Sequence, residues 1–330
     1  MFTLLCLLMP LPLIAKSNKS RADSTKDATP ILWSNPGDIV SRDLFYGPGG
    51  QAHQPHTRYT FGKEDFEGTS PKFEIHDENG TKWKVKLGPE AKPETVASRL
   101  LWAAGYFSNE DYFVRDLQVE NMQPLKRGQK LIGPHGTMHN ARLKRYLKGE
   151  KKIGSWQWRK NPFTGTRELN GLRVMMALIN NWDLKDENNS VYERKDTDKN
   201  ISLHYAVSDL GGSFGTTGLS FPDRNSKGNL SAYSHSKFIK KVTAQYVDFN
   251  VPTRPNLWHL VNPKEFMSRM HLRWIGRHIP RQDAHWIGQL LSQLSDDQIR
   301  QAFRAADYSP DEVEEFSRVV EQRIKELNRL

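Results

Sequence analysis

Two aspartates and one asparagine have the types and spacing of residues that could act on phosphate groups. Asp183 begins the segment DLKDEN, and Asn188 follows it by five positions. Asp209 begins a second segment, DLGG, 26 residues after Asp183. Carboxylate and amide oxygens are ligands of hard divalent cations, and a carboxylate can also orient a hydroxyl group. These residue types favour metal-assisted chemistry at a phosphate group.

Regular elements are expected to position both segments. Leu169, Leu172, Met176 and Ile179 recur at helical spacing and predict a buried helix that runs directly into the first segment. The patterns at residues 191–192 and 203–207 predict two short strands around a polar turn. The DLGG segment follows the second strand, so a helix and a strand pair separate and orient the two polar segments.

This order of helix, DLKDEN, strand pair and DLG resembles the protein-kinase-like superfamily. DLKDEN is similar to the kinase catalytic loop, and DLG is similar to the metal-binding D-x-G motif. The resemblance implies that Asp183 orients an acceptor hydroxyl group, while Asn188 and Asp209 hold Mg²⁺ or Mn²⁺. It also implies that ATP is the phosphate donor, and Lys185, inside the same motif, is assigned to the catalytic residues.

Upstream, alternation of apolar residues predicts a β-hairpin over residues 73–87 with a turn at DENG, residues 77–80. Pro93 suits the first position of a following helix, which ends at Gly105. The kinase resemblance implies that a lysine on this strand contacts the nucleotide phosphates and that a glutamate on the helix positions it.

Lys84 and Lys86 lie on the same predicted strand face, so alternation leaves both open for the phosphate-contacting role. We prefer Lys86, because a shorter connection to the helix follows it. Glu94 shares its helix face with Ala97 and Leu101, where an unpaired carboxylate would be costly, so a lysine partner is expected. The alternative for Glu94 is a first-turn residue that complements the helix dipole.

Several departures indicate the atypical branch of the superfamily, which includes secretory-pathway, spore-coat and toxin-antitoxin serine kinases. Asn181-Trp182 replaces the usual His-Arg, Leu210 replaces Phe, and neither a G-x-G-x-x-G loop nor an Ala-Pro-Glu triplet is present. Residues 68–70 could cover the phosphates, although a plain loop is the preferred interpretation. Within that branch the chain looks like an exported bacterial group.

The resemblance implies an α+β fold with two lobes. We expect a small β-rich N-lobe over residues 59–125 and a larger helical C-lobe over residues 126–330, which holds both polar segments. Capping-box patterns at residues 295–298 and 309–312 predict two helices near the C-terminus.

Composition limits the class of protein. The 330 residues are 37% hydrophobic and 26% charged, which is typical of a globular chain and not of a disordered or collagen-like one. Forty-eight Lys and Arg against 38 Asp and Glu leave a net charge of +10, which favours phosphate-bearing or acidic partners. Cys6 is the only cysteine, so an intrachain disulfide and a cysteine-based metal cluster are excluded.

The N-terminus resembles a signal peptide. Residues 1–15 are apolar but too short to span a bilayer, Pro10 and Pro12 interrupt them, and a basic stretch follows. We expect a signal peptide over residues 1–22, a linker over residues 23–58, and export to a periplasmic or secreted location. The alternative is an internal N-terminal helix in a cytoplasmic protein, and no other run is long enough for a membrane span.

A basic segment over residues 139–167 provides the main alternative function. We interpret it as a solvated face, but Lys151, Lys152 and Arg159 could dock an acidic partner or polyanion on a kinase fold that lacks catalysis. Trp156 and Trp158 are interleaved with its basic residues. A nucleic-acid role is not favoured, because only the charge supports it.

Other candidate sites are weaker. Residues 196–200 begin like a calcium loop, but Ile201 stands at the glycine position, so a solvated turn is expected. Two histidine pairs have spacings that a metal could use but lack an acidic third ligand nearby. They are His53 with His56, and His135 with His139. Ser208 and Ser213 lack the surroundings of a serine nucleophile.

Overall fold

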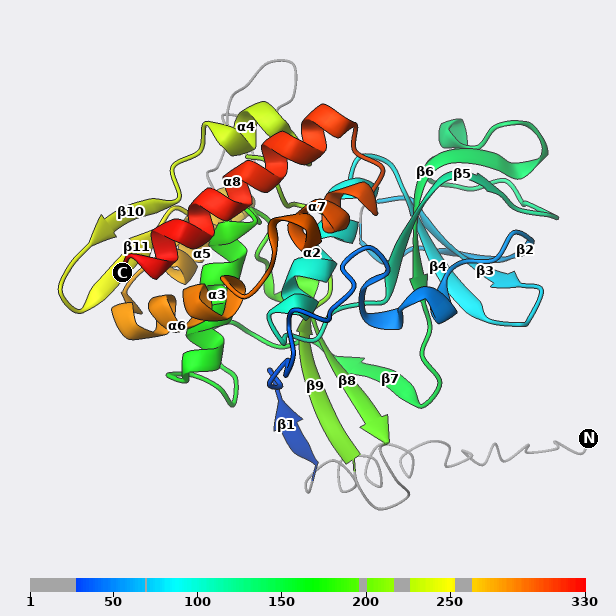
Figure 1. The fold of residues 1–330 in the computed structure, drawn as a ribbon. Coiled ribbons are helices and arrows are strands. Elements are labelled where there is room, and N and C mark those ends of the chain that lie inside the picture. The colour runs from blue at the N-terminus through cyan, green and yellow to red at the C-terminus, as the bar shows by residue number, and fades with distance from the viewer. Residues whose placement is uncertain (1–27, 69, 196–200, 217–225, 253–262) are drawn as a thin grey trace, which may run out of the picture.

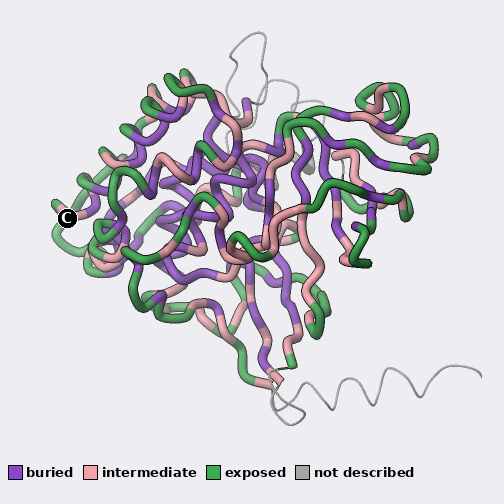
Figure 2. The backbone as a smooth tube through the Cα atoms, turned by 45° about the vertical axis from the view of Figure 1, so that its right-hand side comes forward, coloured by how far each residue is buried: buried purple, intermediate pink, exposed green. Residues whose placement is uncertain are grey.

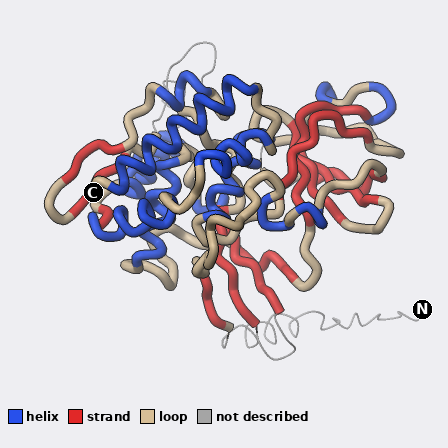
Figure 3. The backbone as a smooth tube through the Cα atoms, in the orientation of Figure 1, coloured by secondary structure: helices blue, strands red, loops and turns tan. Residues whose placement is uncertain are grey.

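A computed structural model describes residues 28–68, 70–195, 201–216, 226–252 and 263–330. It has a small lobe built on an antiparallel sheet and a larger lobe that is mainly helical (Figures 1 and 3). The predicted two-lobed α+β fold is therefore confirmed. Buried residues run along the strands of the small lobe and through the interior of the larger one (Figure 2).

The small lobe contains a five-stranded antiparallel sheet with the order β2-β3-β4-β6-β5. Its strands are β2 (Tyr59–Asp65), β3 (Lys72–Asp77), β4 (Lys82–Leu87), β5 (Asp111–Gln118) and β6 (Thr137–Arg145). The predicted hairpin is confirmed as β3 and β4. Its turn is fixed by Asp77, whose Oδ1 accepts hydrogen bonds from the backbone N–H groups of Asn79 and Thr81.

The predicted lobe boundary at residue 125 is wrong. Strand β6 lies between β4 and β5 and pairs with both, so the small lobe extends to Arg145. Ala141 and Leu143 are fully buried on one face of β6, while Arg142 and Lys144 alternate with them. The basic residues made this strand look like a solvated segment in the sequence.

Helix α2 (Ala91–Ala103) begins three residues after β4 and lies between the lobes, against β5, β6 and α7 (Asp296–Arg304). It is buried along most of its length, starts two residues before Pro93, and is followed by Gly105 at φ +87°. The helix predicted from Pro93 to Gly105 is confirmed, with a start two residues earlier.

The larger lobe holds the remaining helices and a four-stranded sheet of order β1-β9-β8-β7. Its strands are β1 (Thr29–Ile31), β7 (Glu150–Gly154), β8 (Asn189–Lys195) and β9 (Ile201–Val207), and its other helices are α3 (Arg167–Leu178), α4 (Leu230–Ser234), α5 (Pro263–Leu272), α6 (Arg281–Leu291) and α8 (Pro310–Asn328). The predicted buried helix is α3, and the two predicted short strands are β8 and β9. The β1 pairing places residues 29–31 of the predicted linker against the larger lobe, whereas Gly50, further along the linker, accepts a hydrogen bond from Tyr112 of β5.

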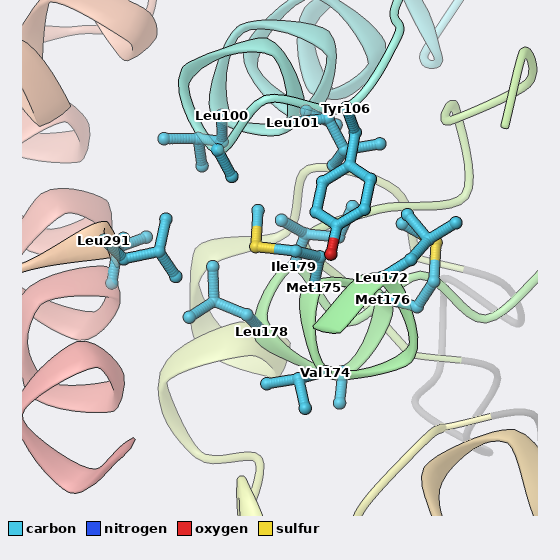
Figure 4. Close-up of a cluster of buried hydrophobic side chains, with 14 of the residues drawn as sticks. Leu100, Leu101, Tyr106, Leu172, Val174, Met175, Met176, Leu178, Ile179 and Leu291 are labelled. Carbon is cyan, nitrogen blue, oxygen red and sulfur yellow. The ribbon is translucent and has the colours of Figure 1, made fainter. Parts of the chain in front are cut away.

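The core of the larger lobe forms where α2 crosses α3. Leu100 and Leu101 of α2 lie above Met175 of α3 and Ile179, the residue after α3, with Leu291 of α6 beside them (Figure 4). All five are at most 1% exposed. This packing fixes the end of α3, from which the DLKDEN segment emerges.

Both predicted capping boxes are present, at the starts of α7 and α8. The helical prediction for the C-terminal third missed a small antiparallel sheet of β10 (Ile239–Val242), β11 (Tyr246–Phe249) and β12 (Ile279–Pro280). Strands of two to four residues are too short to show a clear alternation of apolar and polar side chains.

In the described part of the chain, no helix combines the length and the apolar character needed to cross a bilayer. The predicted signal peptide at residues 1–22 and the polar turn at residues 196–200 both lie outside the described residues.

A buried arginine of α8 holds the end of α3 in place. Arg323 is 2% exposed and donates hydrogen bonds to the Leu178 carbonyl oxygen at 2.8 Å, to Asn180 Oδ1 at 3.0 Å and to Ser236 Oγ at 2.7 Å. Replacement of Arg323 by Met removes these donors, and we expect the free energy of unfolding in urea to fall by about 2–4 kcal/mol.

Arg318→Met is the matched control, because Arg318 lies on the same helix but is exposed and pairs with Glu315 on the helix surface. Its unfolding midpoint should stay at the wild-type value. Equal midpoints for Arg323→Met and Arg318→Met would contradict the proposed role of Arg323.

Candidate functional site

The ammonium group of Lys86 lies among three carboxylates at the junction of the lobes. Its Nζ is 2.7 Å from Glu94 Oε2, 2.8 Å from Glu90 Oε2 and 3.0 Å from Asp209 Oδ1. The Lys86 side chain is 1% exposed. Three separate segments therefore meet at this one nitrogen, namely β4, the start of α2 and the loop after β9.

Local structure explains why two of these carboxylates meet Lys86. Strand β4 ends at Leu87 and α2 begins at Ala91, so the short connection turns the helix back onto the strand. Glu90 and Glu94 are four residues apart at the start of the helix, and residues at this spacing lie on one helix face. The predicted contact between Lys86 and Glu94 is present.

Charge pairing keeps Lys86 and Asp209 ionised despite the burial of the cluster. Burial lowers the pKa of Lys86, but Glu94, Asp209 and Glu90 outweigh this and raise it above the ordinary lysine value. Burial raises the pKa of Asp209, but Lys86 and Lys72 outweigh this and hold it well below the ordinary aspartate value. Asp209 is therefore a carboxylate at neutral pH, which is the form that can ligate a metal ion.

A second layer of charges supports Glu94. Arg142 of β6 has Nη2 3.1 Å from Glu94 Oε1 and Nη1 3.3 Å from Asp111 Oδ1. All three side chains are buried. Burial raises the pKa of Glu94, and Arg142 and Lys86 oppose that rise. Neither Arg142 nor Asp111 was predicted from the sequence to be part of the site.

The alternative lysine, Lys84, has other partners. Its Nζ is 2.6 Å from Asp65 Oδ2 and 4.0 Å from Glu67 Oε2. The geometry therefore agrees with the preference for Lys86. A further lysine was missed: Lys72 of β3 lies opposite Lys86 in the strand register, and its Nζ is 3.9 Å from Asp209 Oδ2.

Asp183 lies just beyond the end of α3, in a loop fixed by polar contacts. Its backbone N–H donates to Asn181 Oδ1 at 3.0 Å, and the Trp182 N–H donates to the Gly212 carbonyl oxygen at 3.1 Å. The Asp183 side chain is one-third exposed, yet its Oδ1 is buried and accepts no hydrogen bond from the described residues. Burial raises the pKa of Asp183, and Lys185 and Arg269 oppose that rise.

Asn188 connects the two polar segments. Its side-chain Nδ2 donates to the Asp183 carbonyl oxygen at 2.6 Å, and its own carbonyl oxygen accepts from the Ser208 and Asp209 N–H groups at 2.9 and 3.1 Å. Asn188, Asp209, Lys86 and Glu94 all line one cleft of about 710 Å³. The structure thus brings the predicted phosphate and metal residues together, with Asp183 and Lys185 at the adjoining loop.

The donor set fits a divalent cation next to a phosphate group. Asp209 supplies an ionised carboxylate and Asn188 an amide, both of which line the cleft. The oxygens of Glu90, Glu94 and Asp209 also lie within 4.8 Å of one another, the only such acidic or histidine group among the described residues. Lys86 already binds all three, so we interpret that triad as a lysine site and not as a metal site.

The other predicted sites are not assembled. His53 pairs with Glu110 at 2.9 Å, His56 lies 3.4 Å from Glu78, and His139 pairs with Asp116 at 2.6 Å, so the histidine pairs are divided between different carboxylates. The glycine-rich turn at residues 68–70 includes residue 69, which lies outside the described residues.

The basic segment is not one solvated face. Arg142, Trp156 and Trp158 are buried, and Lys144 Nζ donates to Tyr192 Oη at 2.9 Å. The expectation of a solvated face is therefore wrong for these residues, because β6 pairs inside the small sheet. Lys151 and Lys152 are exposed on β7 and line the cleft.

Similarities to known proteins are remote. The chain matches no protein-family model and no curated protein sequence. Among solved structures, it is similar to the proinflammatory kinase CtkA of Helicobacter pylori, with 10% identity over 82% of this chain and 96% of that one and a TM-score of 0.43.

Two further structures show weaker similarity. The Rio2 kinase of Chaetomium thermophilum, solved as an ADP/Mg²⁺-phosphoaspartate complex, matches 82% of this chain and 72% of its own with 9% identity and a TM-score of 0.33. A Golgi casein kinase matches 88% of this chain and 78% of its own with 11% identity and a TM-score of 0.31. These values carry no information about activity.

The features of the chain itself define its class. It has two lobes, a strand lysine paired with a helix glutamate, and a D-x-G segment beside the cleft that the two lobes share. Together they give it a two-lobed, kinase-like fold, without a G-x-G-x-x-G loop.

The pKa of Glu90 predicts how stability depends on pH. Burial raises this pKa, but Lys86 and Lys227 outweigh burial and lower it from 4.5 to about 2. Glu90 therefore stabilises the fold fully above pH 4.5, and its contribution is lost as the pH falls toward 2. Urea unfolding of wild type and Glu90→Gln at pH 6, 4 and 3 should show a steeper loss of stability in the wild type. Identical pH dependence in the two proteins would contradict this pairing.

Proposed function

We propose that the protein is an atypical kinase-like phosphotransferase that moves the γ-phosphate of ATP to a hydroxyl acceptor. The observation that carries this proposal is the contact of one buried ammonium, Lys86, with both Glu94 and Asp209, in a cleft that Asn188 also lines. Phosphoryl transfer depends mainly on positioning and on electrostatic stabilisation, and this cluster supplies fixed charges for both.

Each residue has a distinct proposed role. Glu94 holds Lys86 in place, and Lys86 contacts the phosphates of the nucleotide. Asn188 and Asp209 would hold Mg²⁺ or Mn²⁺, which when bound neutralises phosphate charge. The different environments of the two carboxylates agree with these roles. Glu94 is buried against Arg142, whereas Asp209 is one-third exposed and can reach a metal ion.

Asp183 is the proposed acceptor-orienting residue. Its side chain is one-third exposed, so the carboxylate can accept a hydrogen bond from an incoming hydroxyl group. In the proposed transfer, the acceptor oxygen bonds to the γ-phosphorus, the bond to the β–γ bridging oxygen breaks, and the hydroxyl proton passes to Asp183. Lys185 lies close enough to oppose the rise in the pKa of Asp183, which supports its place in the catalytic loop.

The acceptor stays open among a protein hydroxyl, a sugar and a small metabolite. Export through residues 1–22 also stays a prediction, and the proposed activity does not depend on it.

Nucleotide binding is tested by thermal unfolding with Mg-ATP and Mn-ATP. At a ligand concentration 100 times Kd, a bound ligand adds about 2.7 kcal/mol to the free energy of unfolding. We expect a metal-dependent rise in Tm for the wild type and none for Asp209→Asn.

The paired substitution Lys151→Ser with Lys152→Ser tests the alternative of a non-catalytic docking protein, and Lys160→Ser, at an exposed residue that does not line the cleft, serves as control. Because Lys151 and Lys152 line the cleft, their loss should weaken the ATP-dependent rise only in part, whereas Lys160→Ser should leave it unchanged. Loss of the rise in the paired variant but not in Asp209→Asn would favour the docking protein and contradict the proposed metal site.

Catalysis is tested separately with Asp183→Asn. A positioned general base contributes about 10²–10⁴-fold to a rate. Release or transfer of labelled γ-phosphate, to water or to the protein itself, should fall by about that factor, while the Mg-ATP-dependent rise in Tm stays. An unchanged rate in a variant that still binds Mg-ATP would exclude Asp183 from the reaction.

A further inference from the structure

The carboxylate of Glu90 is held by three donors from three different segments. Its Oε2 lies 2.8 Å from Lys86 Nζ and accepts a hydrogen bond from Ser70 Oγ at 3.0 Å, while its Oε1 pairs with Lys227. The Glu90 side chain is 12% exposed. Phosphate oxygens also accept hydrogen bonds from ammonium and hydroxyl groups. The three donors thus form an anion site, and Glu90 occupies it.

Carboxylates surround the Lys86 ammonium group while Glu90 stays in place. Its Nζ lies 2.7–3.0 Å from oxygens of Glu90, Glu94 and Asp209, and it donates hydrogen bonds to Glu90 and Asp209. Because the Lys86 side chain is only 1% exposed, a phosphate that contacts it must displace one of these carboxylates.

Glu90 is the carboxylate most able to leave. Glu94 is 1% exposed and also paired with Arg142, and Asp209 is the proposed metal ligand. Glu90 has a second cation of its own in Lys227, on a different oxygen. It also follows Gly88, which has φ +98°, at the short connection between β4 and α2.

We propose that Glu90 occupies the phosphate side of Lys86 in the nucleotide-free protein, and that an entering polyphosphate displaces it toward Lys227. The inference rests on the proposed nucleotide function and adds a residue that opposes nucleotide binding. Gly211 is part of the same arrangement, because a Cβ atom there would lie 2.7 Å from Glu90 Cβ and Oε2. The absence of a side chain at Gly211, the glycine of the D-x-G segment, therefore leaves room for the Glu90 side chain.

The rival interpretation is that Glu90, Glu94 and Asp209 together bind a metal ion. Their oxygens are close enough, but a metal at that point would have to expel Lys86 from all three. The two interpretations predict opposite effects of removing the Glu90 charge.

The test is isothermal titration of wild type and Glu90→Gln with two probes, Mg-ATP and metal-free tripolyphosphate in EDTA. The variant keeps the size of the side chain but removes the competing negative charge. Couplings between neighbouring groups correspond to changes in Kd of about 2–150-fold, and we expect Glu90→Gln to bind both probes more tightly within that range. Glu94→Gln, the matched variant one turn along the helix, should not tighten binding of either probe.

Lys227→Met gives a second measurement that does not require the Glu90 variant to fold. Without Lys227 the displaced carboxylate loses the cation toward which it would move, so both probes should bind more weakly than to wild type.

The outcomes separate this inference from the proposed function. Wild-type binding of Mg-ATP with equal or weaker binding by Glu90→Gln would overturn the displacement of Glu90 and leave the nucleotide site standing. Weaker Mg-ATP binding together with a lower affinity for Mn²⁺ alone would identify Glu90 as a metal ligand and also overturn it. Absence of binding of both probes by both proteins would overturn the proposed function and the displacement together.

Discussion

The structure depends on ion pairs between carboxylates and a row of basic side chains on the inner face of the small sheet. Lys72, Lys86 and Arg142 lie opposite one another on β3, β4 and β6, so their side chains share one face of the sheet. Removing such charges from water costs several kcal/mol each unless carboxylates pair with them. The carboxylates come from outside these three strands, namely from the start of α2, from β5 and from the loop after β9. The charge requirement therefore fixes where the helix and the D-x-G loop meet the sheet.

A continuous chain of contacts carries this constraint to the proposed catalytic loop. Asp209 is held by Lys86, its backbone N–H is bonded to Asn188, and the Asn188 side chain holds the Asp183 backbone. The larger lobe supports the other end through α3 and the buried Arg323. Asp183 is thus positioned from both lobes, and its Oδ1 lies 3.9 Å from Arg269 Nη2.

Local patterns predicted much of this arrangement. Signals that lie close together in the sequence predicted several elements. Alternation of apolar residues predicted the hairpin, helical spacing predicted α2 and α3, and capping boxes predicted α7 and α8. The predicted contact of Lys86 with Glu94 came from the family resemblance, and the short strand-to-helix connection explains it physically.

The parts that could not be predicted depend on contacts between distant segments. Strand β6 looked solvated because Arg142 and Lys144 alternate with apolar residues, and only its partners on other strands reveal that these cations are paired. Two site residues that were not predicted, Glu90 and Lys72, could have been found from the sequence. Glu90 stands four residues before Glu94, and the register of the predicted hairpin places Lys72 opposite Lys86.

The central claim is that the Lys86 cluster and Asn188 form one metal-nucleotide site, and a crystal structure with Mn²⁺ and a non-hydrolysable ATP analogue tests it most directly. The account predicts an anomalous manganese peak within ligand distance of Asp209 and Asn188, with a phosphate in contact with Lys86. A nucleotide bound elsewhere, or manganese coordinated away from both Asp209 and Asn188, would contradict it.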